Sequence, residues 1–168
     1  MTEQELLAQA AALLDLCRAK KLKIATAESC TGGLVAATLT EIPGSSDVVE
    51  RGFVTYSNEA KHEMLGVPVG TLERHGAVSR ETAQAMATGA LAHAPVDLAV
   101  SITGIAGPGG ATPNKPVGLV HFGAASRSGK LIHRERRYGD IGRAQVRRAS
   151  VIEALAMLHE LAAQEKAR

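Results

Sequence analysis

The sequence predicts a three-layer α/β/α domain on a mixed, mostly parallel β-sheet that ends in a C-terminal hairpin. Three observations support this fold class. Short apolar runs alternate with segments whose apolar residues recur at helical spacing, which is typical of strands joined by helices. The apolar run at residues 96–103 is nearly continuous, as in a strand buried on both faces of a sheet. Two strand-like segments flank Arg127-Ser128-Gly129, which predicts a hairpin.

The size and composition are those of one ordinary globular domain. We expect all 168 residues to form it, with enough core to fold without disulfides or metal. A net charge of +2 and an aromatic content of 2% argue against a nucleic-acid partner. No run is apolar enough to span a bilayer, and the acidic N-terminus does not resemble a signal peptide. The two cysteines make no disulfide framework, so we expect a cytoplasmic protein without a membrane partner.

Capping and breaking residues set the expected helix boundaries. Thr2 followed by Glu5 is a capping-box pattern, Ser79 is a candidate N-cap, and Pro95 follows the helix that Ser79 begins. The expected helices span residues 3–20, 33–41, 58–65 and 80–93, with a further helical turn at 71–75 and a last helix that begins near residue 142. The expected strands span residues 22–27, 48–56, 96–103, 117–126 and 130–138.

Residues 24–39 carry the strongest chemical signal, because an apolar run, a small polar turn and a helical segment follow one another there. Such a strand–turn–helix leaves the first N–H groups of the helix unpaired, and Gly32 and Gly33 let a substrate approach the backbone. Ser29 lies in the turn, where a hydroxyl beside an oxyanion site is a candidate nucleophile for acyl transfer. The alternative is that Ser29 or Thr31 only caps the helix.

Two neighbours of Ser29 compete with it or support it. Cys30 is a rival nucleophile, because a thiol at a helix N-terminus has a depressed pKa. Adjacent residues near a strand end point in opposite directions, so we expect only one of the two to face the pocket. Glu28 could orient the nucleophile, although a salt bridge or a helix cap is an equally good interpretation.

Tyr56-Ser57-Asn58-Glu59-Ala60-Lys61 is the second informative stretch. If Ser57 or Asn58 caps the short helix, Lys61 falls in its first turn, where the helix dipole and burial lower a lysine pKa. A neutral lysine can take the proton of a serine hydroxyl, which gives a Ser–Lys hydrolase without histidine. Tyr56 could relay that proton or hold the lysine in place. The alternative is a solvated surface lysine with an extended stem.

A glycine-rich loop, residues 104–116, follows the most apolar strand and holds four glycines and three prolines. Ligands of open α/β sheets bind beyond the carboxyl ends of strands, so Thr103, Gly104 and Gly107 are expected in a pocket wall. The loop matches neither the phosphate loop of nucleotide hydrolases nor the dinucleotide fingerprint.

Arginines gather near the start of the last expected helix. Arg143 and Arg147 are four residues apart, so two like charges share the positive end of the helix dipole, an arrangement that a phosphate would relieve. Together with Arg148 they could instead form a solvated basic patch. The six histidines show no metal-ligand spacing, and we expect no metal site.

Several motifs together resemble those of the CinA C-terminal domain family, in the family's order and over nearly the whole chain. They are Thr26-Ala-Glu-Ser-Cys-Thr-Gly-Gly33, Arg51-Gly-Phe-Val-Thr-Tyr-Ser-Asn-Glu-Ala-Lys61, His75-Gly-Ala-Val-Ser79, residues 101–108 and Lys115-Pro-Val-Gly118. The resemblance implies nicotinamide-nucleotide amidase activity, in which nicotinamide mononucleotide is hydrolysed to nicotinic acid mononucleotide and ammonia for pyridine-nucleotide salvage.

The resemblance also implies roles for individual residues. Ser29 matches the family's nucleophile, Lys61 its general base and Tyr56 the tyrosine that assists them. The residues expected to contact the substrate or its oxyanion are Thr31, Gly32, Gly33, Thr103, Gly104, Gly107, Arg143 and Arg147. No cofactor is implied, and a homodimer is expected because family members are typically dimeric.

The chain departs from the family pattern in two respects. Relatives usually open the last helix with Gly-Asp-Arg, whereas Ile141 and Gly142 separate Asp140 from Arg143 here, so the phosphate could be held by Arg143 or by other arginines of that helix. Longer relatives carry a further N-terminal hydrolase domain, for which this chain has no room, and amidase activity alone is expected. The competing function is a non-catalytic pyridine-nucleotide-binding or regulatory module related to competence- and damage-inducible proteins.

Overall fold

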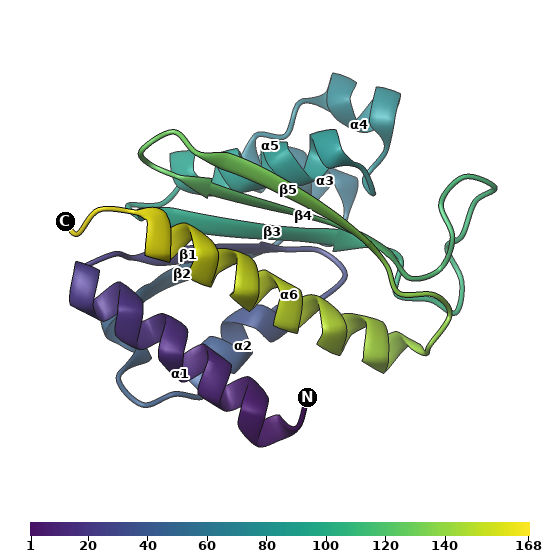
Figure 1. Ribbon diagram of the computed structural model, residues 1–168. Coiled ribbons are helices and arrows are strands. Elements are labelled where there is room, and N and C mark those ends of the chain that lie inside the picture. The colour runs from purple at the N-terminus through teal and green to yellow at the C-terminus, as the bar shows by residue number, and fades with distance from the viewer.

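The computed structural model describes residues 1–168, which form a five-stranded sheet with helices on both faces (Figure 1). The strands are β1 (Ile24–Glu28), β2 (Val49–Val54), β3 (Leu98–Gly104), β4 (Leu119–Ser126) and β5 (Leu131–Arg137). They lie in the order β2-β1-β3-β4-β5. β1 pairs in parallel with β2 and β3, whereas β4 pairs antiparallel with β3 and β5. The predicted fold class, a mixed sheet that ends in a hairpin, is confirmed.

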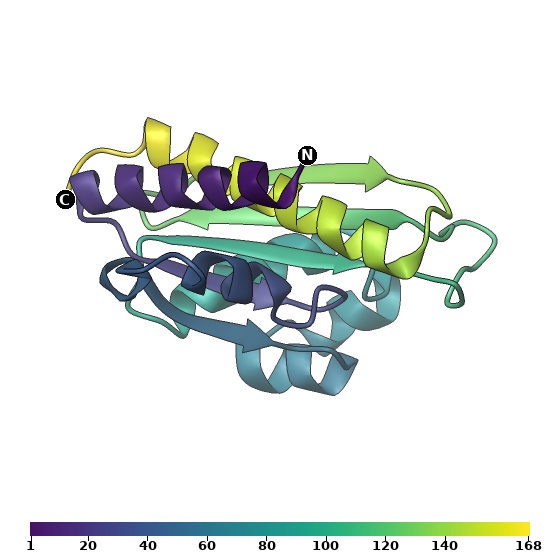
Figure 2. The ribbon, with the colours of Figure 1, turned by 90° about the horizontal axis from the view of Figure 1, so that it is seen from below.

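The helices form the two outer layers of the domain. The element bounds are α1 (Glu3–Lys20), α2 (Leu34–Thr40), η1 (Ser45–Asp47), α3 (Asn58–Leu65), α4 (Val69–His75), α5 (Arg80–Ala92) and α6 (Arg143–Gln164). α1, α2 and α6 cover one face of the sheet, and α3, α4 and α5 cover the other (Figures 1 and 2). The two longest helices, α1 and α6, pack against each other on their shared face.

Side-chain caps explain where the helices begin. The Thr2 hydroxyl accepts a hydrogen bond from the Glu5 amide at 3.1 Å, and the Glu5 carboxylate accepts one from the Thr2 amide at 2.8 Å, so the predicted capping box is formed. Ser57 caps α3 and Ser79 caps α5, each through a hydroxyl that accepts a hydrogen bond from the amide three residues further on, without the return bond of a capping box. α4 begins at residue 69, two residues earlier than expected, because Pro68 stands at its N-cap.

The two faces of the sheet carry apolar clusters of different size. β1 and β4 are buried along their whole length, and the larger apolar cluster lies under α1, α2 and α6, with Leu13, Phe122 and Leu155 among its members. A smaller cluster around Ala27, Leu65 and Met86 lies under the opposite layer. None of the helices has both the length and the apolar character needed to cross a membrane.

The topology brings three strand ends to one edge of the sheet. β1, β2 and β3 run parallel, and Glu28, the last residue of β1, lies opposite Val54 and Ile102 in the neighbouring strands. The chain passes from β1 outward to β2 and then back past β1 to β3, so the strand order reverses at the β1/β3 boundary, which is a topological switch point. Ligands of open α/β sheets bind just beyond the carboxyl ends of strands at this point.

Close packing of α3 on α5 depends on Gly89. A Cβ atom at this position would lie 2.0 Å from the carbonyl oxygen of Leu65, the last residue of α3. No side chain fits between the two helices there, so glycine sets the distance at which α3 docks.

We therefore expect Gly89→Ala to lower the free energy of unfolding by about 1–3 kcal/mol, because the added methyl group pushes α3 off α5. Urea unfolding followed by circular dichroism measures the change. Thr88→Ala, at the exposed neighbouring position of the same helix, is the matched control and should be close to neutral. A Gly89→Ala protein as stable as the wild type would contradict this account of the packing.

Candidate active site

A cavity of about 250 Å³ opens at the edge where the three parallel strands end. Its lining includes Ser29 after β1, Tyr56 after β2 and Thr103 at the end of β3. Lys61 from α3 and Arg143 from α6 complete it, so elements from both helical layers contribute. The sheet topology thus brings together residues that are far apart in the sequence.

The centre of the cavity is a contact between a serine and a lysine. Ser29 Oγ lies 3.0 Å from Lys61 Nζ, and the lysine side chain is 1% exposed. Nζ also donates to the carbonyl oxygens of Thr55 at 2.9 Å and Tyr56 at 3.3 Å. A neutral amine has two N–H donors and one lone pair. The ammonium donates to all three oxygens, whereas in the neutral amine the two carbonyls can take both N–H groups and the lone pair can accept the serine proton.

Burial favours that neutral form. It lowers the pKa of Lys61 to about 8 from an ordinary value of 10.5, because removing water disfavours the charged ammonium. No carboxylate forms an ion pair with Nζ. A lysine with a pKa near neutrality can serve as a general base, which is the role predicted for it.

Cys30 also lines the cavity. Ser29 and Cys30 therefore both reach it, contrary to the expectation that only one of these adjacent residues would. Its thiol behaves differently from the depressed pKa expected at a helix N-terminus. Burial, with a smaller contribution from the nearby Glu28 carboxylate, raises the pKa of Cys30 to about 12. A thiol that holds its proton at neutral pH is a poor nucleophile, and the structure therefore favours Ser29.

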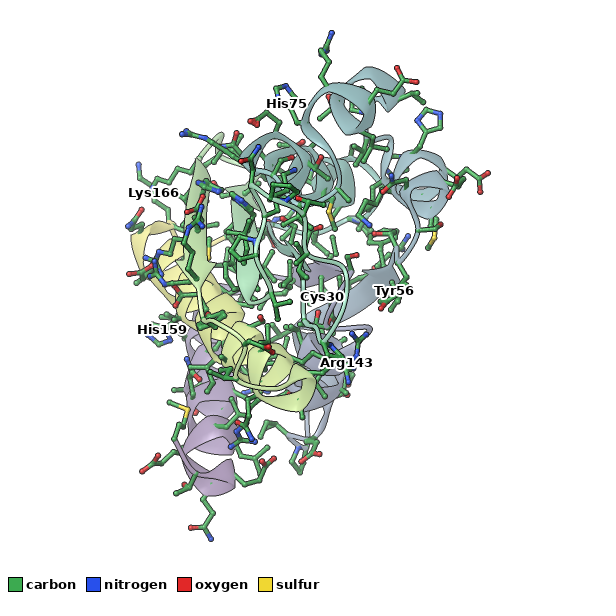
Figure 3. All side chains as sticks on the ribbon, turned by 90° about the vertical axis from the view of Figure 1, so that its right-hand side faces the viewer. Cys30, Tyr56, His75, Arg143, His159 and Lys166 are labelled. Atoms are coloured by element: carbon green, nitrogen blue, oxygen red, sulfur yellow. The ribbon has the colours of Figure 1, made fainter.

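Tyr56 and Arg143 form the mouth of the cavity, and Figure 3 shows both near Cys30. Arg143 donates to the Tyr56 hydroxyl at 2.8 Å and to the carbonyl oxygen of Gly107 at 2.8 Å. The phenol is turned outward, with the residue 61% exposed, and only the backbone carbonyl of Tyr56 contacts Lys61. Tyr56 therefore holds the lysine through its main chain, and its hydroxyl is paired with Arg143.

The three arginines of α6 point to different places. Arg143 alone lines the cavity. Arg147 lies behind the nucleophile turn and donates to the carbonyl oxygens of Cys30 and Thr31, both at 3.2 Å. Arg148 pairs with Glu3 on α1 and is directed away from the site. The sequence could not separate these side chains, because their directions depend on how α6 packs over the turn.

The turn itself differs from the expected substrate contact. Thr31, Gly32 and Gly33 do not line the cavity. The Gly32 amide donates to the Ser29 carbonyl at 3.0 Å, and the Gly33 amide donates to the Glu28 carboxylate at 3.2 Å. These glycine amides are already paired within the turn, so they are not free to bind a substrate or an oxyanion.

The far wall of the cavity comes from the glycine-rich loop and from a segment to which the sequence assigned no role. Thr103, Gly104 and Gly107 line the cavity as expected. Ala77 and Val78 face them, and the Thr103 hydroxyl donates to the Ala77 carbonyl at 2.8 Å. The only sequence signal for this segment was its presence in the motif that begins at residue 75.

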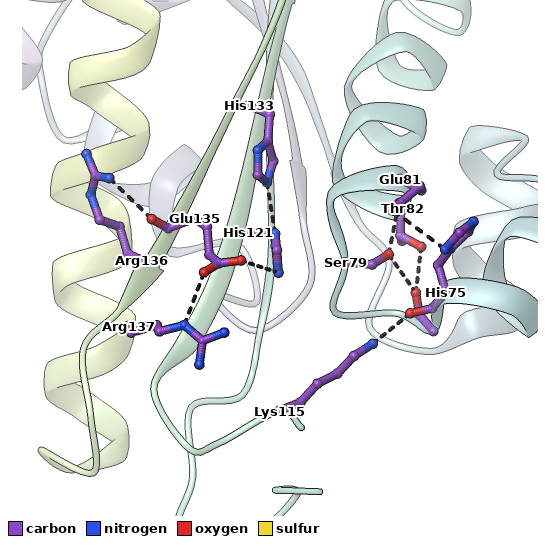
Figure 4. A network of polar contacts seen from close by, with 11 residues as sticks. His75, Ser79, Glu81, Thr82, Lys115, His121, His133, Glu135, Arg136 and Arg137 are labelled. Atoms are coloured by element: carbon purple, nitrogen blue, oxygen red, sulfur yellow. Dashed lines mark hydrogen bonds and ion pairs between the residues drawn. The ribbon is translucent and has the colours of Figure 1, made fainter. Parts of the chain in front are cut away.

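A polar network braces that wall from behind (Figure 4). The hydroxyls of Ser79 and Thr82 both donate to the Gly76 carbonyl, at 3.0 and 2.7 Å. Lys115, from the loop between β3 and β4, donates to the His75 carbonyl at 2.6 Å. The network therefore ties the start of α5 to the loop on the other side of the cavity.

The histidines lie outside the site. His121 Nδ1 is 2.8 Å from His133 Nε2 across β4 and β5, and the two rings stack with their centroids 5.1 Å apart (Figure 4). Burial lowers the pKa of both imidazoles. No group of three or more His, Cys, Asp or Glu side chains is arranged to hold a metal ion.

Comparisons with known proteins point to one family. A family model described as the CinA C-terminal domain matches residues 6–162. The crystal structure of competence/damage inducible protein CihA from Agrobacterium tumefaciens is 52% identical, with a TM-score of 0.93 and coverage of 96% of each chain. A structure of the CinA superfamily protein KP700603 from Klebsiella pneumoniae is 35% identical, with a TM-score of 0.89, and covers 98% of this chain and 100% of its own.

Curated relatives differ in length. The nicotinamide-nucleotide amidohydrolase PncC of Enterobacter agglomerans is 54% identical over 115 residues, which are 68% of this chain and 70% of the relative. A CinA-like protein of Chloroherpeton thalassium is 61% identical over 117 residues, which are 70% of this chain but only 28% of that protein. The chain therefore spans less than a third of the longer relative.

Proposed function

The chain belongs to the CinA C-terminal domain family, and from this premise we propose that it is an amidohydrolase that converts nicotinamide mononucleotide to nicotinic acid mononucleotide and ammonia. The observation that carries the proposal is the 3.0 Å contact between Ser29 Oγ and a buried Lys61 Nζ whose N–H groups are taken by carbonyls. A module that only bound a nucleotide would have no use for a buried amine directed at a hydroxyl.

The reaction follows from that contact. Lys61 takes the hydroxyl proton as Ser29 Oγ attacks the carboxamide carbon, which produces a tetrahedral oxyanion. When the oxyanion collapses, the C–N bond breaks and the lysine returns its proton to the leaving ammonia. Water then attacks the acyl-serine ester with Lys61 again as base, releasing the carboxylate and the free serine. No metal or organic cofactor takes part in these steps.

The nucleotide class is supported by the mouth of the cavity. Arg143 presents a guanidinium there that is paired with a phenol and a carbonyl rather than a carboxylate, and a guanidinium can hold a phosphate through two parallel hydrogen bonds. The pyridinium charge of the mononucleotide makes its carboxamide more electrophilic. A substrate with both groups would place its ring toward Ser29 and its phosphate toward Arg143.

We expect Ser29→Ala to reduce ammonia release from nicotinamide mononucleotide by about a thousandfold or more, because no other group can form the acyl-enzyme. Cys30→Ala should keep most of the activity, since its thiol is protonated at neutral pH. A coupled ammonia assay at matched protein concentrations measures both. An active Ser29→Ala protein would exclude the serine mechanism. Saturable nucleotide binding without ammonia release from the wild type would favour the non-catalytic module.

The pH dependence should report the lysine. Only the neutral amine can act as base, so kcat/KM should rise with pH and level off above the Lys61 pKa of about 8. Lys61→Arg keeps a cation that cannot be deprotonated and should lose activity at every pH. Rates measured between about pH 6.5 and 9.5 test this expectation. A flat profile, or activity that survives in Lys61→Ala near neutral pH, would remove lysine from the mechanism.

Arg143 should distinguish phosphorylated from unphosphorylated substrates. Arg143→Ala is expected to lower kcat/KM for nicotinamide mononucleotide about 10- to 100-fold, the effect of losing a hydrogen-bonded ion pair. For nicotinamide riboside, which has no phosphate, the same variant should change kcat/KM little. Arg148→Ala, on the same helix but paired with Glu3, is the control and should affect neither. Equal losses on both substrates in Arg143→Ala would show that this arginine does not read the phosphate.

A further inference from the structure

We propose that Glu28 and Arg147 are positioning residues that clamp the turn 29–33 from two sides and keep the amide of Cys30, a residue that lines the cavity, available for the oxyanion. The inference deepens the proposed hydrolase function and rests on it. Neither side chain lines the cavity. Each acts on the reaction through the backbone that carries Ser29.

Glu28 fills the N-terminus of α2. The residue is fully buried, and its carboxylate accepts hydrogen bonds from the amides of Gly33 at 3.2 Å, Val35 at 2.9 Å and Ala36 at 3.1 Å. The N-terminus of a helix attracts anions, and here that anion comes from the chain itself. The Glu28 backbone also pairs with both neighbouring strands, so the carboxylate ties the start of α2 to the sheet.

Arg147 holds the carbonyl side of the same turn. Its Nε donates to the Cys30 carbonyl and its Nη2 to the Thr31 carbonyl, both at 3.2 Å. A Cβ atom added to Gly32 would lie 3.6 Å from the same Nη2, so the guanidinium packs directly on the turn. One planar group thus fixes two successive peptide units through its fork of donors.

The hydrogen bonds of the turn leave few amides for a ligand. The Ser29 amide donates to the Ile102 carbonyl, the Gly32 amide to the Ser29 carbonyl and the Leu34 amide to the Thr31 carbonyl. With the three amides bound by Glu28, the free donors from residue 29 to residue 36 are those of Cys30 and Thr31. They are the central residues of the tight turn that begins at Ser29, and of the two only Cys30 lines the cavity.

This arrangement makes the oxyanion site a property of the turn rather than of the helix. Oxyanion donors stabilise a transition state only when they are fixed before the reaction begins. Rotation of the peptide units after Ser29 would move both free amides together with the nucleophile. Arg147 holds the middle of the turn through the carbonyls of Cys30 and Thr31, and Glu28 holds its end through the Gly33 amide, so both restrain the turn that carries the free amides.

The test measures Ser29 reactivity without the nucleotide. An alkyl fluorophosphonate forms a bond between Ser29 Oγ and phosphorus, with loss of fluoride and transfer of the hydroxyl proton to Lys61, and intact mass spectrometry follows the adduct. We expect Glu28→Gln and Arg147→Met to slow labelling about 10- to 100-fold, the effect of moving a catalytic group by around an ångström. In the amidase assay kcat should fall by a similar factor while KM stays nearly constant.

Asp97→Asn is the matched control. Asp97 is also a buried carboxylate that accepts a backbone N–H, from Lys23 at 2.8 Å, but it lies at the amino end of β3, opposite the site. Its variant should lose stability without slowing the labelling. If Glu28→Gln does not fold, as judged by circular dichroism, Arg147→Met decides the question, since Arg147 is only partly buried.

The outcomes separate the two proposals. Labelling of both variants at the wild-type rate, or a loss matched by Asp97→Asn, would overturn the clamp and leave the hydrolase proposal standing. A wild-type protein that is not labelled, or a Ser29→Ala protein that still is, would overturn the hydrolase itself. Slow labelling confined to Glu28→Gln and Arg147→Met, with Ser29→Ala unlabelled, supports both.

Discussion

The candidate active site depends on one energetically unfavourable feature, the burial of the Lys61 amine against the Ser29 hydroxyl. A pKa lowered from 10.5 to about 8 corresponds to roughly 3 kcal/mol between the charged and neutral forms of the side chain. Near neutral pH most Lys61 side chains still carry their proton, so folding must bury a charge that water would stabilise. The close docking of α3 on α5 at Gly89 and the caps of both helices supply interactions that offset this loss. No carboxylate pairs with the amine. Such a partner would stabilise the ammonium, return the pKa of Lys61 to its ordinary value and so remove the base.

The sheet order explains how so small a cavity gathers its groups. Three parallel strands end at one edge, so the residues after β1 and β2 and those ending β3 meet there although whole helices separate them along the chain. The antiparallel strands β4 and β5 complete the sheet before α6 begins. α6 packs over the turn, so Arg143 lines the cavity and Arg147 contacts the backbone behind the turn. One helix thus serves the ligand side and the supporting side of the same turn, with its two arginines one helical turn apart.

Local signals made much of this predictable from the sequence. Thr2, Ser57 and Ser79 mark helix starts that the structure confirms, because capping depends on neighbouring residues only. The position of Lys61 in the first turn of α3 followed from a cap at Ser57 or Asn58, and the structure shows that Ser57 is the cap. The different contacts of Arg143 and Arg147 could not be predicted from the sequence, because they depend on the angle at which α6 crosses the turn. The pairing of Glu28 with the amides of α2 was one of several open interpretations, since a buried carboxylate can equally form an ion pair.

The choice between the two neighbouring nucleophiles has the same physical origin as the activation of the base. Burial disfavours charge of either sign, so it lowers the pKa of the Lys61 ammonium and raises that of the Cys30 thiol to about 12. The first effect makes the lysine lone pair accessible as the pH approaches 8, and the second withholds a thiolate over the same range. Glu28 strengthens the second effect, because its carboxylate neutralises the helix terminus that would otherwise favour a thiolate. Burial of both side chains, with the Glu28 carboxylate beneath the turn, therefore selects oxygen over sulfur without excluding either side chain from the cavity.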